Sequence, residues 1–154
     1  MIELPHAVVG ATIALKIGNP ALSLPLALAS HFILDLVPHW NPHLNQEVKK
    51  YGKITDRTKA IIISDVAASL AAGTFIATTV LPNTTHFIVI ILGAFLAVLP
   101  DVAEAPYFFW GSKNKFLTKL IAFQSSLQLN VPVVPGLISQ ALVLTAAFWW
   151  IFNS

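Results

Sequence analysis

Cysteine is absent from this sequence, and charged residues are scarce. The missing cysteine excludes disulfide bonds and thiolate chemistry. Charged residues make up only 10% of the chain, whereas soluble domains contain about 25%. A net charge of +2 provides no broad basic stripe, so we expect no nucleic-acid partner. The N-terminus also lacks a basic segment followed by a cleavage site, and we expect no cleavable signal peptide.

Apolar residues take the place of the missing charge, at 56% of 154 residues. They form five segments, at residues 6–18, 21–37, 59–81, 86–100 and 134–152. A membrane-spanning helix needs about 20 residues. The first two segments are shorter, so we expect a hairpin that either just crosses the membrane or re-enters it. The sequence predicts an all-α fold: one transmembrane helical domain over residues 1–154, with about five hydrophobic helices.

Two polar regions separate the apolar segments. Residues 41–58 read as a solvated loop. In residues 111–130, apolar side chains such as Phe116 and Leu120 are interleaved with Lys115 and Lys119. This pattern is typical of an amphipathic helix that lies on the membrane interface.

The stretch "SHFILDLVPHW" at residues 30–40 carries three polar groups in an apolar segment. His31, Asp35 and His39 follow one another at intervals of four residues, which places them on one face of a helix. Pro38 ends or kinks that helix. His39 therefore either continues the face or lies on a turn after it.

Other ionisable groups lie at matching ends of the apolar segments. His6 begins the first segment, Asp65 lies about two turns into the third, and Asp101 and Glu104 follow the fourth. If each segment or hairpin reverses the chain direction, these groups share the membrane face of Asp35. Each ionisable group inside a membrane segment costs roughly 2.5–3.5 kcal/mol. Such a set is expensive unless its members pair or bind a metal ion.

Imidazole and carboxylate ligands suit zinc, with manganese or iron as alternatives. We therefore predict a site for a divalent metal ion, whose ligands are His6, His31, Asp35, His39 and Asp101. Glu104 and Asp65 are the candidates for a catalytic general base. Each acid also has a structural interpretation. Asp65 suits the positive N-terminal end of its helix, and Asp101 suits an N-cap that leaves Glu104 in solvent.

Basic residues support one orientation of the chain. Eight of the nine Lys and Arg residues fall on the face of the polar cluster, and Lys16 falls near the opposite face. Basic residues concentrate on the cytoplasmic side of membrane proteins. We therefore expect a cytoplasmic N-terminus, an external C-terminus and a place in the prokaryotic inner (cytoplasmic) membrane.

Three motifs, "LPHAVVG", "SHFILDLVPHW" and "LPDVAEAP", resemble those of small prokaryotic integral-membrane proteins classed as inner-membrane metal-dependent hydrolases. The resemblance covers most of residues 1–110. The middle motif is also distantly similar to the His-x-x-x-Asp core of zinc-dependent phospholipase C. The resemblance implies ligand roles for His6, His31, Asp35 and Asp101, and phosphoester hydrolysis as the activity. The chain departs from the family where Gln124 and Gln128 stand at positions that often hold histidine.

Two kinds of function therefore fit the sequence. The first is a membrane-embedded metal-dependent hydrolase that acts on a phosphoester or lipid-derived substrate at the cytoplasmic interface, with the bilayer as its partner. The second is a non-enzymatic membrane protein, either a small transporter or channel-like protein or an assembly protein. In that case the same polar cluster binds a cation or proton, or pairs with the loop lysines.

Overall fold

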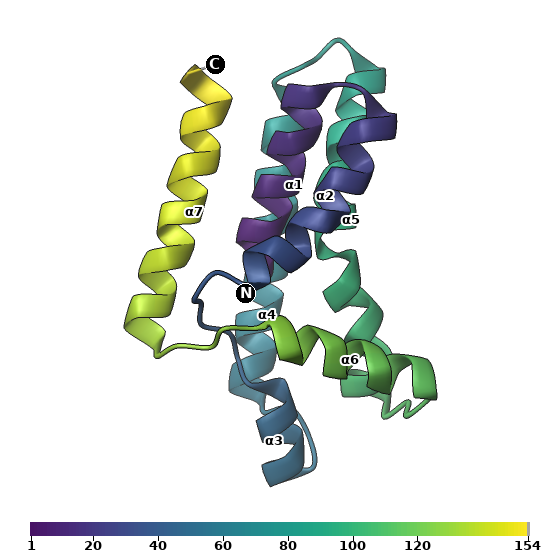
Figure 1. Cartoon of the computed structure of the whole chain (residues 1–154), viewed down its shortest axis with the longest axis vertical. Helices are drawn as coiled ribbons and strands as arrows, with labels where there is room; N and C mark the ends of the chain where they lie inside the picture. The colour runs from purple at the N-terminus through teal and green to yellow at the C-terminus, as the bar shows by residue number, and fades with distance from the viewer. Residues whose placement is uncertain (154) are drawn as a thin grey trace.

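Helices make up most of the computed structural model, which describes residues 1–153 (Figure 1). No β-strand occurs among these residues, so the predicted all-α class is confirmed. The helices are α1 (Glu3–Ile17), α2 (Pro20–Asp35), α3 (Leu44–Tyr51), α4 (Asp56–Thr78), α5 (Thr84–Trp110), α6 (Lys115–Leu127) and α7 (Val133–Asn153).

Three helices, α4, α5 and α7, are long and apolar enough to cross a membrane. The predicted number of about five was too high. Helices α1 and α2 have only 15 and 16 residues, which corresponds to a rise of about 22–24 Å, and a bilayer core measures about 30 Å. Gly18, at a φ of 67° that favours glycine, ends α1, and Pro20 at once begins α2. The two helices therefore form a short hairpin.

The surface of the spanning helices is apolar. Large side chains such as Ile63 on α4 and Leu142 on α7 are 68% and 64% exposed. Contiguous exposure of this kind is unfavourable in water and is expected in lipid. The structure thus agrees with the membrane class that the composition indicates.

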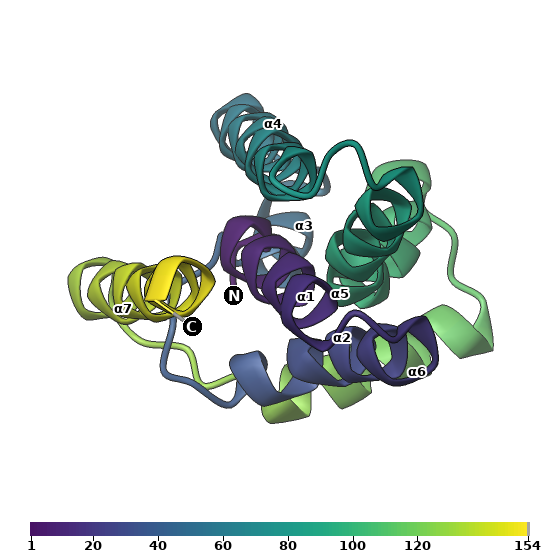
Figure 2. The ribbon, with the colours of Figure 1, turned by 90° about the horizontal axis from the view of Figure 1, so that it is seen from above.

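Helix α1 occupies the centre of the bundle, with α2, α4, α5 and α7 around it (Figure 2). The start of α1 and the end of α2 lie at the same level of the molecule, and their turn lies at the other end (Figure 1). The hairpin therefore returns to the side from which it starts. This arrangement brings His6 and Asp35 together, although 29 positions separate them in the sequence.

Glycine and alanine allow α1 and α5 to pack closely. A Cβ atom added to Gly10 would lie 2.5 Å from both the Gly93 carbonyl oxygen and the Ala97 Cβ. One added to Gly93 would lie 2.6 Å from the Ala14 Cβ. Small residues of this kind let helix backbones approach in a membrane, where van der Waals contact drives association. The crossing also sets the level of His6 relative to the second half of α5.

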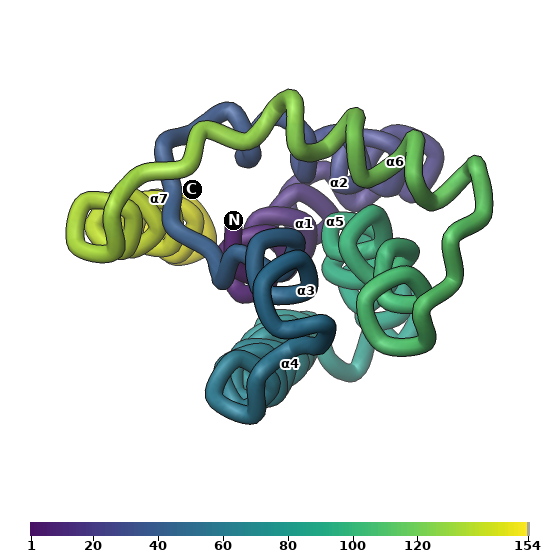
Figure 3. Tube along the Cα trace, turned by 90° about the horizontal axis from the view of Figure 1, so that it is seen from below, coloured from purple at the N-terminus to yellow at the C-terminus, as the bar shows by residue number. Residues whose placement is uncertain are grey.

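The lower end of the molecule holds α3, α6 and the start of α4 (Figures 1 and 3). The helix predicted within residues 111–130 is confirmed as α6, which begins after its N-cap residue Asn114. It runs across the end of the bundle rather than along it. Residues 41–58, which we expected to form a loop, contain α3 instead. The Glu47 carboxylate accepts hydrogen bonds from the backbone N–H of Thr55 and the hydroxyl of Thr58, at 3.0 and 2.7 Å. This contact ties α3 to the start of α4, and sequence periodicity does not reveal it.

Candidate metal centre

Asp35 lies at the centre of the predicted ligand set. It is the last residue of α2 and is fully buried. Its Oδ1 atom lies 2.7 Å from the Met1 amino group and 3.5 Å from the Nε2 atom of His6. The Nε2 atoms of His31 and His39 lie 3.6 and 4.0 Å from its carboxylate oxygens. Three imidazoles from separate parts of the chain thus converge on one carboxylate.

The ring of His31 has a defined tautomer when it is neutral. Its Nδ1 atom donates a hydrogen bond to the Ala97 carbonyl oxygen at 2.8 Å, so Nε2 carries a lone pair. That Nε2 atom faces three oxygen atoms, from Gln124 at 2.8 Å and from Asp35 and Asp101 at 3.6 Å each. A lone pair among acceptor atoms lacks a donor, and this is unfavourable in the protein interior. A proton or a metal ion at this point would satisfy the group.

His6 provides a second, independent sign of a missing partner. Its side chain is fully buried, and neither ring nitrogen makes a hydrogen bond within residues 1–153. The ring stacks on His31 with centroids 4.3 Å apart. Ligand atoms of His6, His31 and Asp101 all lie within 4.8 Å of one another. These three residues form a group that is able to hold a metal ion.

His39 lies beyond the end of α2, after Pro38, as one of the two sequence interpretations anticipates. A backbone hydrogen bond from His39 to the Leu129 carbonyl at 3.0 Å, and a bridge to Asn130, hold its segment against the residues after α6. Burial lowers the pKa of His39, so its ring is neutral at neutral pH. Its Nδ1 donates to the Val37 carbonyl at 2.8 Å, and its Nε2 has no hydrogen-bond partner in the described chain.

This donor set fits a transition-metal ion. Two of the three histidines donate Nδ1–H to a backbone carbonyl and keep Nε2 as the available donor atom. That is the usual outer-sphere arrangement of metal-ligating histidines, because it fixes both the tautomer and the ring orientation. Imidazole and carboxylate donors are those that zinc, manganese and iron accept. The identity of the ion does not follow from the donors alone.

Glu104 and Gln124 lie beside His31 at one edge of the cluster. The Gln124 amide nitrogen donates to a Glu104 carboxylate oxygen and, at 3.4 Å, to the Pro100 carbonyl. These bonds turn the amide oxygen toward His31. Asp101 lies one turn before Glu104 on α5, with a side chain that is 20% exposed. Glu104 therefore faces the cluster through Gln124 and reaches the cavity described below.

Asp65 lies outside the ligand group and instead caps the N-terminus of α1. Its two carboxylate oxygens accept the backbone N–H groups of Glu3 and Leu4, at 2.6 and 3.1 Å. These groups belong to the first turn of α1, which has no side-chain cap of its own. A carboxylate on α4 thus caps α1, one turn before His6. Asp65 does lie at a positive helix terminus, but that terminus belongs to a different helix.

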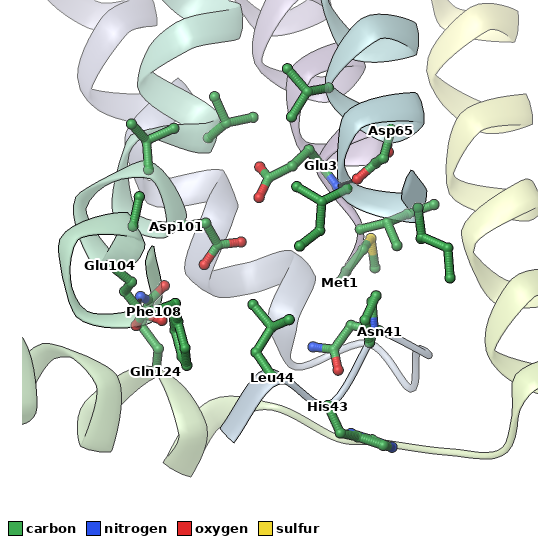
Figure 4. A pocket seen from close by; sticks show the side chains of 18 of the residues that line it. Met1, Glu3, Asn41, His43, Leu44, Asp65, Asp101, Glu104, Phe108 and Gln124 are labelled. Carbon is green, nitrogen blue, oxygen red and sulfur yellow. Dashed lines mark hydrogen bonds between the residues drawn. The ribbon is translucent and has the colours of Figure 1, made fainter. Parts of the chain in front are cut away.

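A cavity of about 600 Å³ adjoins the cluster, with α4 and α5 on its two sides (Figure 4). Its polar wall includes the carboxylates of Glu3, Asp65, Asp101 and Glu104. Its volume falls within the range of about 300–1,000 Å³ that is usual for ligand sites. Asp101 joins the two regions, because it lines the cavity and also lies beside His31.

Sequence reasoning missed several members of this site. The amino group of Met1 carried no pattern that predicts its ion pair with Asp35. Gln140 on α7 accepts the backbone N–H of Ile2 and donates to the Trp40 carbonyl, also without a sequence signal. Gln124 was noticed only as a replacement for histidine, and its position against His31 gives that replacement a structural meaning.

Two histidines and one glutamine lie apart from the cluster. His86 hydrogen-bonds to the Ala14 carbonyl at 3.3 Å, near the hairpin turn, so its omission from the site agrees with the structure. His43 is exposed at the cavity. Gln128 accepts a hydrogen bond from the Asn41 amide at 3.2 Å, away from the three clustered histidines. Comparison with known proteins leaves the family open: no family model, no curated protein and no solved structure matches this chain.

Proposed function

We propose that this protein is a membrane-embedded, metal-dependent hydrolase that acts on a phosphoester or lipid-derived substrate. The observation that carries the proposal is the meeting of acceptor atoms around His31 Nε2, beside the His6 ring, whose nitrogens make no hydrogen bond within the described residues. Buried polar groups without partners are costly, so a cation among them would stabilise the cluster. The adjoining cavity gives a substrate access to Asp101.

His6, His31 and Asp101 would hold the metal ion, and Asp35 and His39 would complete or orient the ligand set. We propose zinc as the ion, with manganese or iron as alternatives. When bound, such an ion acts as a Lewis acid that lowers the pKa of water and polarises a phosphoryl oxygen.

The chain's own residues would position and move protons. Glu104 lies on the cavity wall, is held by the Gln124 amide, and is the carboxylate placed to accept a proton from attacking water. Asp65 has both oxygens engaged by the start of α1, so we assign it a positioning role for His6. The buried side of the cluster would exclude bulk water.

The distribution of basic residues supports a site at the cytoplasmic face of an inner membrane. Helices α3 and α6 and the start of α4 carry most of the lysines and lie at the end where the N-terminus is found. The C-terminus lies at the opposite end (Figure 1). Following the positive-inside rule, we propose a cytoplasmic N-terminus and an external C-terminus.

Elemental analysis of the detergent-purified protein tests the proposal, paired with hydrolysis of a chromogenic phosphodiester before and after chelation. We expect a bound transition metal, activity that chelation removes, and a loss of metal affinity in His31→Ala of roughly tenfold or more. His86→Ala is the matched control, because His86 lies near the hairpin turn. Metal content and activity that are equal in the two variants would contradict the proposal.

A further inference from the structure

We propose that the substrate carries a hydrocarbon chain and enters the cavity sideways from the bilayer, between α4 and α5. The inference rests on the proposed function for the fate of the headgroup, but the route itself follows from the cavity walls. The headgroup is a phosphoester, and its source is a membrane amphiphile rather than a solute from the cytoplasm.

The cavity has two chemically different sides. Its polar side holds Asp65 and Asp101 at the level of the cluster (Figure 4). Its apolar side is built from the spanning helices themselves, with Val66 and Leu70 from α4 and Phe95 from α5. A ligand that fills this cavity must therefore be polar at one end and apolar at the other.

The apolar wall is also part of the lipid-facing surface. Val66, Leu70 and Phe95 line the cavity, yet they are 42%, 67% and 48% exposed. Residues of two membrane-spanning helices that are exposed in this way contact acyl chains. We therefore infer that the cavity opens to the bilayer between α4 and α5, so that a hydrocarbon chain would reach it without crossing a polar barrier.

Farther from the cluster, α4 and α5 pack directly against each other. This contact closes one end of the proposed opening between them. A Cβ atom added to Gly73 of α4 would lie 3.3 Å from the Ala94 Cβ of α5, so the backbones are close there. Toward Asp65 and Asp101 the two helices stand on either side of the start of α1 (Figure 4). A chain that inserts between them points from the cluster toward the Gly73 contact.

The charge of the polar side explains why the headgroup needs the proposed metal site. The residues that line the cavity include four acids but no lysine or arginine that would attract a phosphate anion. An ion held by His6, His31 and Asp101 would supply the positive charge that the headgroup needs. The apolar wall and the metal site would therefore select the two ends of one molecule.

Photolabelling in nanodiscs tests the route. The full-length protein is reconstituted in phosphatidylcholine with a trace of hexadecyl phosphate that carries a diazirine on its chain, and labelled peptides are mapped after irradiation. We expect labelling to concentrate on the α4 and α5 residues of the opening. Val66→Trp should reduce it by roughly tenfold.

Ile63→Trp is the matched control, because Ile63 is 68% exposed on the same helix and does not line the cavity. Labelling that is as heavy on α7 as on α4 and α5, or that is equal in the two tryptophan variants, would overturn the lateral route. Labelling at the opening that chelation leaves unchanged supports the route and counts against the metal-held headgroup. The failure of one proposal is thus distinguishable from the failure of the other.

Discussion

At the scale of single residues, the amide of Gln124 stands where an additional imidazole would contact the cluster. Its oxygen lies 2.8 Å from His31 Nε2, and its nitrogen is engaged by Glu104. An amide oxygen is a weaker ligand than imidazole for zinc. The strength of the proposed metal binding is therefore expected to depend on this one side chain.

Replacement of Gln124 by histidine should tighten metal binding. We expect Gln124→His to lower the Kd for zinc by roughly tenfold, because a nitrogen donor joins the group around His31. Competition titration with a fluorescent zinc chelator measures the change. Gln128→His serves as the control, since Gln128 hydrogen-bonds to Asn41 instead. An equal gain in the two variants would show that position 124 has no special relation to the site.

At the scale of helices, the Glu47 carboxylate fastens α3 to the start of α4. The backbone N–H of Thr55 and the hydroxyl of Thr58 hold the pKa of Glu47 below its ordinary value. Because the pKa of Glu47 is lower in the folded than in the unfolded protein, the stabilisation from its ionised carboxylate is fully present above the unfolded pKa of about 4.3. It is lost as the pH falls through the lowered value.

Amide hydrogen exchange of α3, corrected for the intrinsic rate, reports this contact. We expect Glu47→Gln to lower protection of α3 at about pH 6, and the difference from the parent to shrink as the pH falls through the lowered pKa of Glu47. Protection factors in α5 provide the internal control. A difference that persists unchanged as the pH falls would indicate that the charge of Glu47 is unimportant.

The crossing of α1 and α5 is the helix contact on which the cluster depends most. Gly10→Ala should destabilise the protein by about 1–3 kcal/mol, because the added methyl group meets backbone and Ala97 at 2.5 Å. Thermal unfolding in detergent measures this loss. Gly73→Ala is the milder control, because its methyl group meets only the Ala94 Cβ at 3.3 Å. Equal unfolding temperatures would contradict close packing at Gly10.

The sequence largely predicted where helices form, but it predicted their lengths and functions less well. The apolar periodicity of α4, α5 and α7 is local, and all three were expected as membrane helices. The short hairpin depends on Gly18 and Pro20, which limit α1 and α2 to less than a bilayer. Helix α3 depends on Glu47, whose partners lie 8 and 11 residues away. Such distant contacts leave no periodic signal.

At the scale of the whole molecule, the hairpin of α1 and α2 starts and ends on the same side. Only the three long helices α4, α5 and α7 therefore carry the chain from one side to the other between the two termini. The hairpin returns to the side of the N-terminus, and α4, α5 and α7 then place the C-terminus opposite (Figure 1). The absence of cysteine makes this arrangement convenient to test, because any introduced thiol is unique.

Impermeant maleimide applied to intact cells should label Asn83→Cys, in the turn between α4 and α5, and spare Lys53→Cys until the membrane is permeabilised. The positive-inside rule gives this direction, since Lys53 lies among the basic residues between α3 and α4. Labelling of each variant in purified, detergent-solubilised protein shows that both thiols are reactive. The reverse pattern in cells would invert the proposed orientation.

The sequence by itself determined the membrane class, the helical class and the end of the molecule at which the polar residues gather. These features follow from composition, from periodicity and from the reversal of direction at each turn, all of which are local. The grouping of His6, His31, Asp35 and Asp101 was predictable for the same reason. Each lies at a definite position along an apolar helix.

Only the tertiary structure decided what each polar group touches. It placed Asp65 at the start of α1, brought His39 back by pairing with the segment after α6, and set the oxygen of Gln124 against His31. It also formed a cavity lined by residues of α4 and α5, which we propose opens to the bilayer. These contacts join residues many positions apart, and their geometry depends on how closely Gly10 and Gly93 let two helices approach. Spacing along one chain carries no information about such distances.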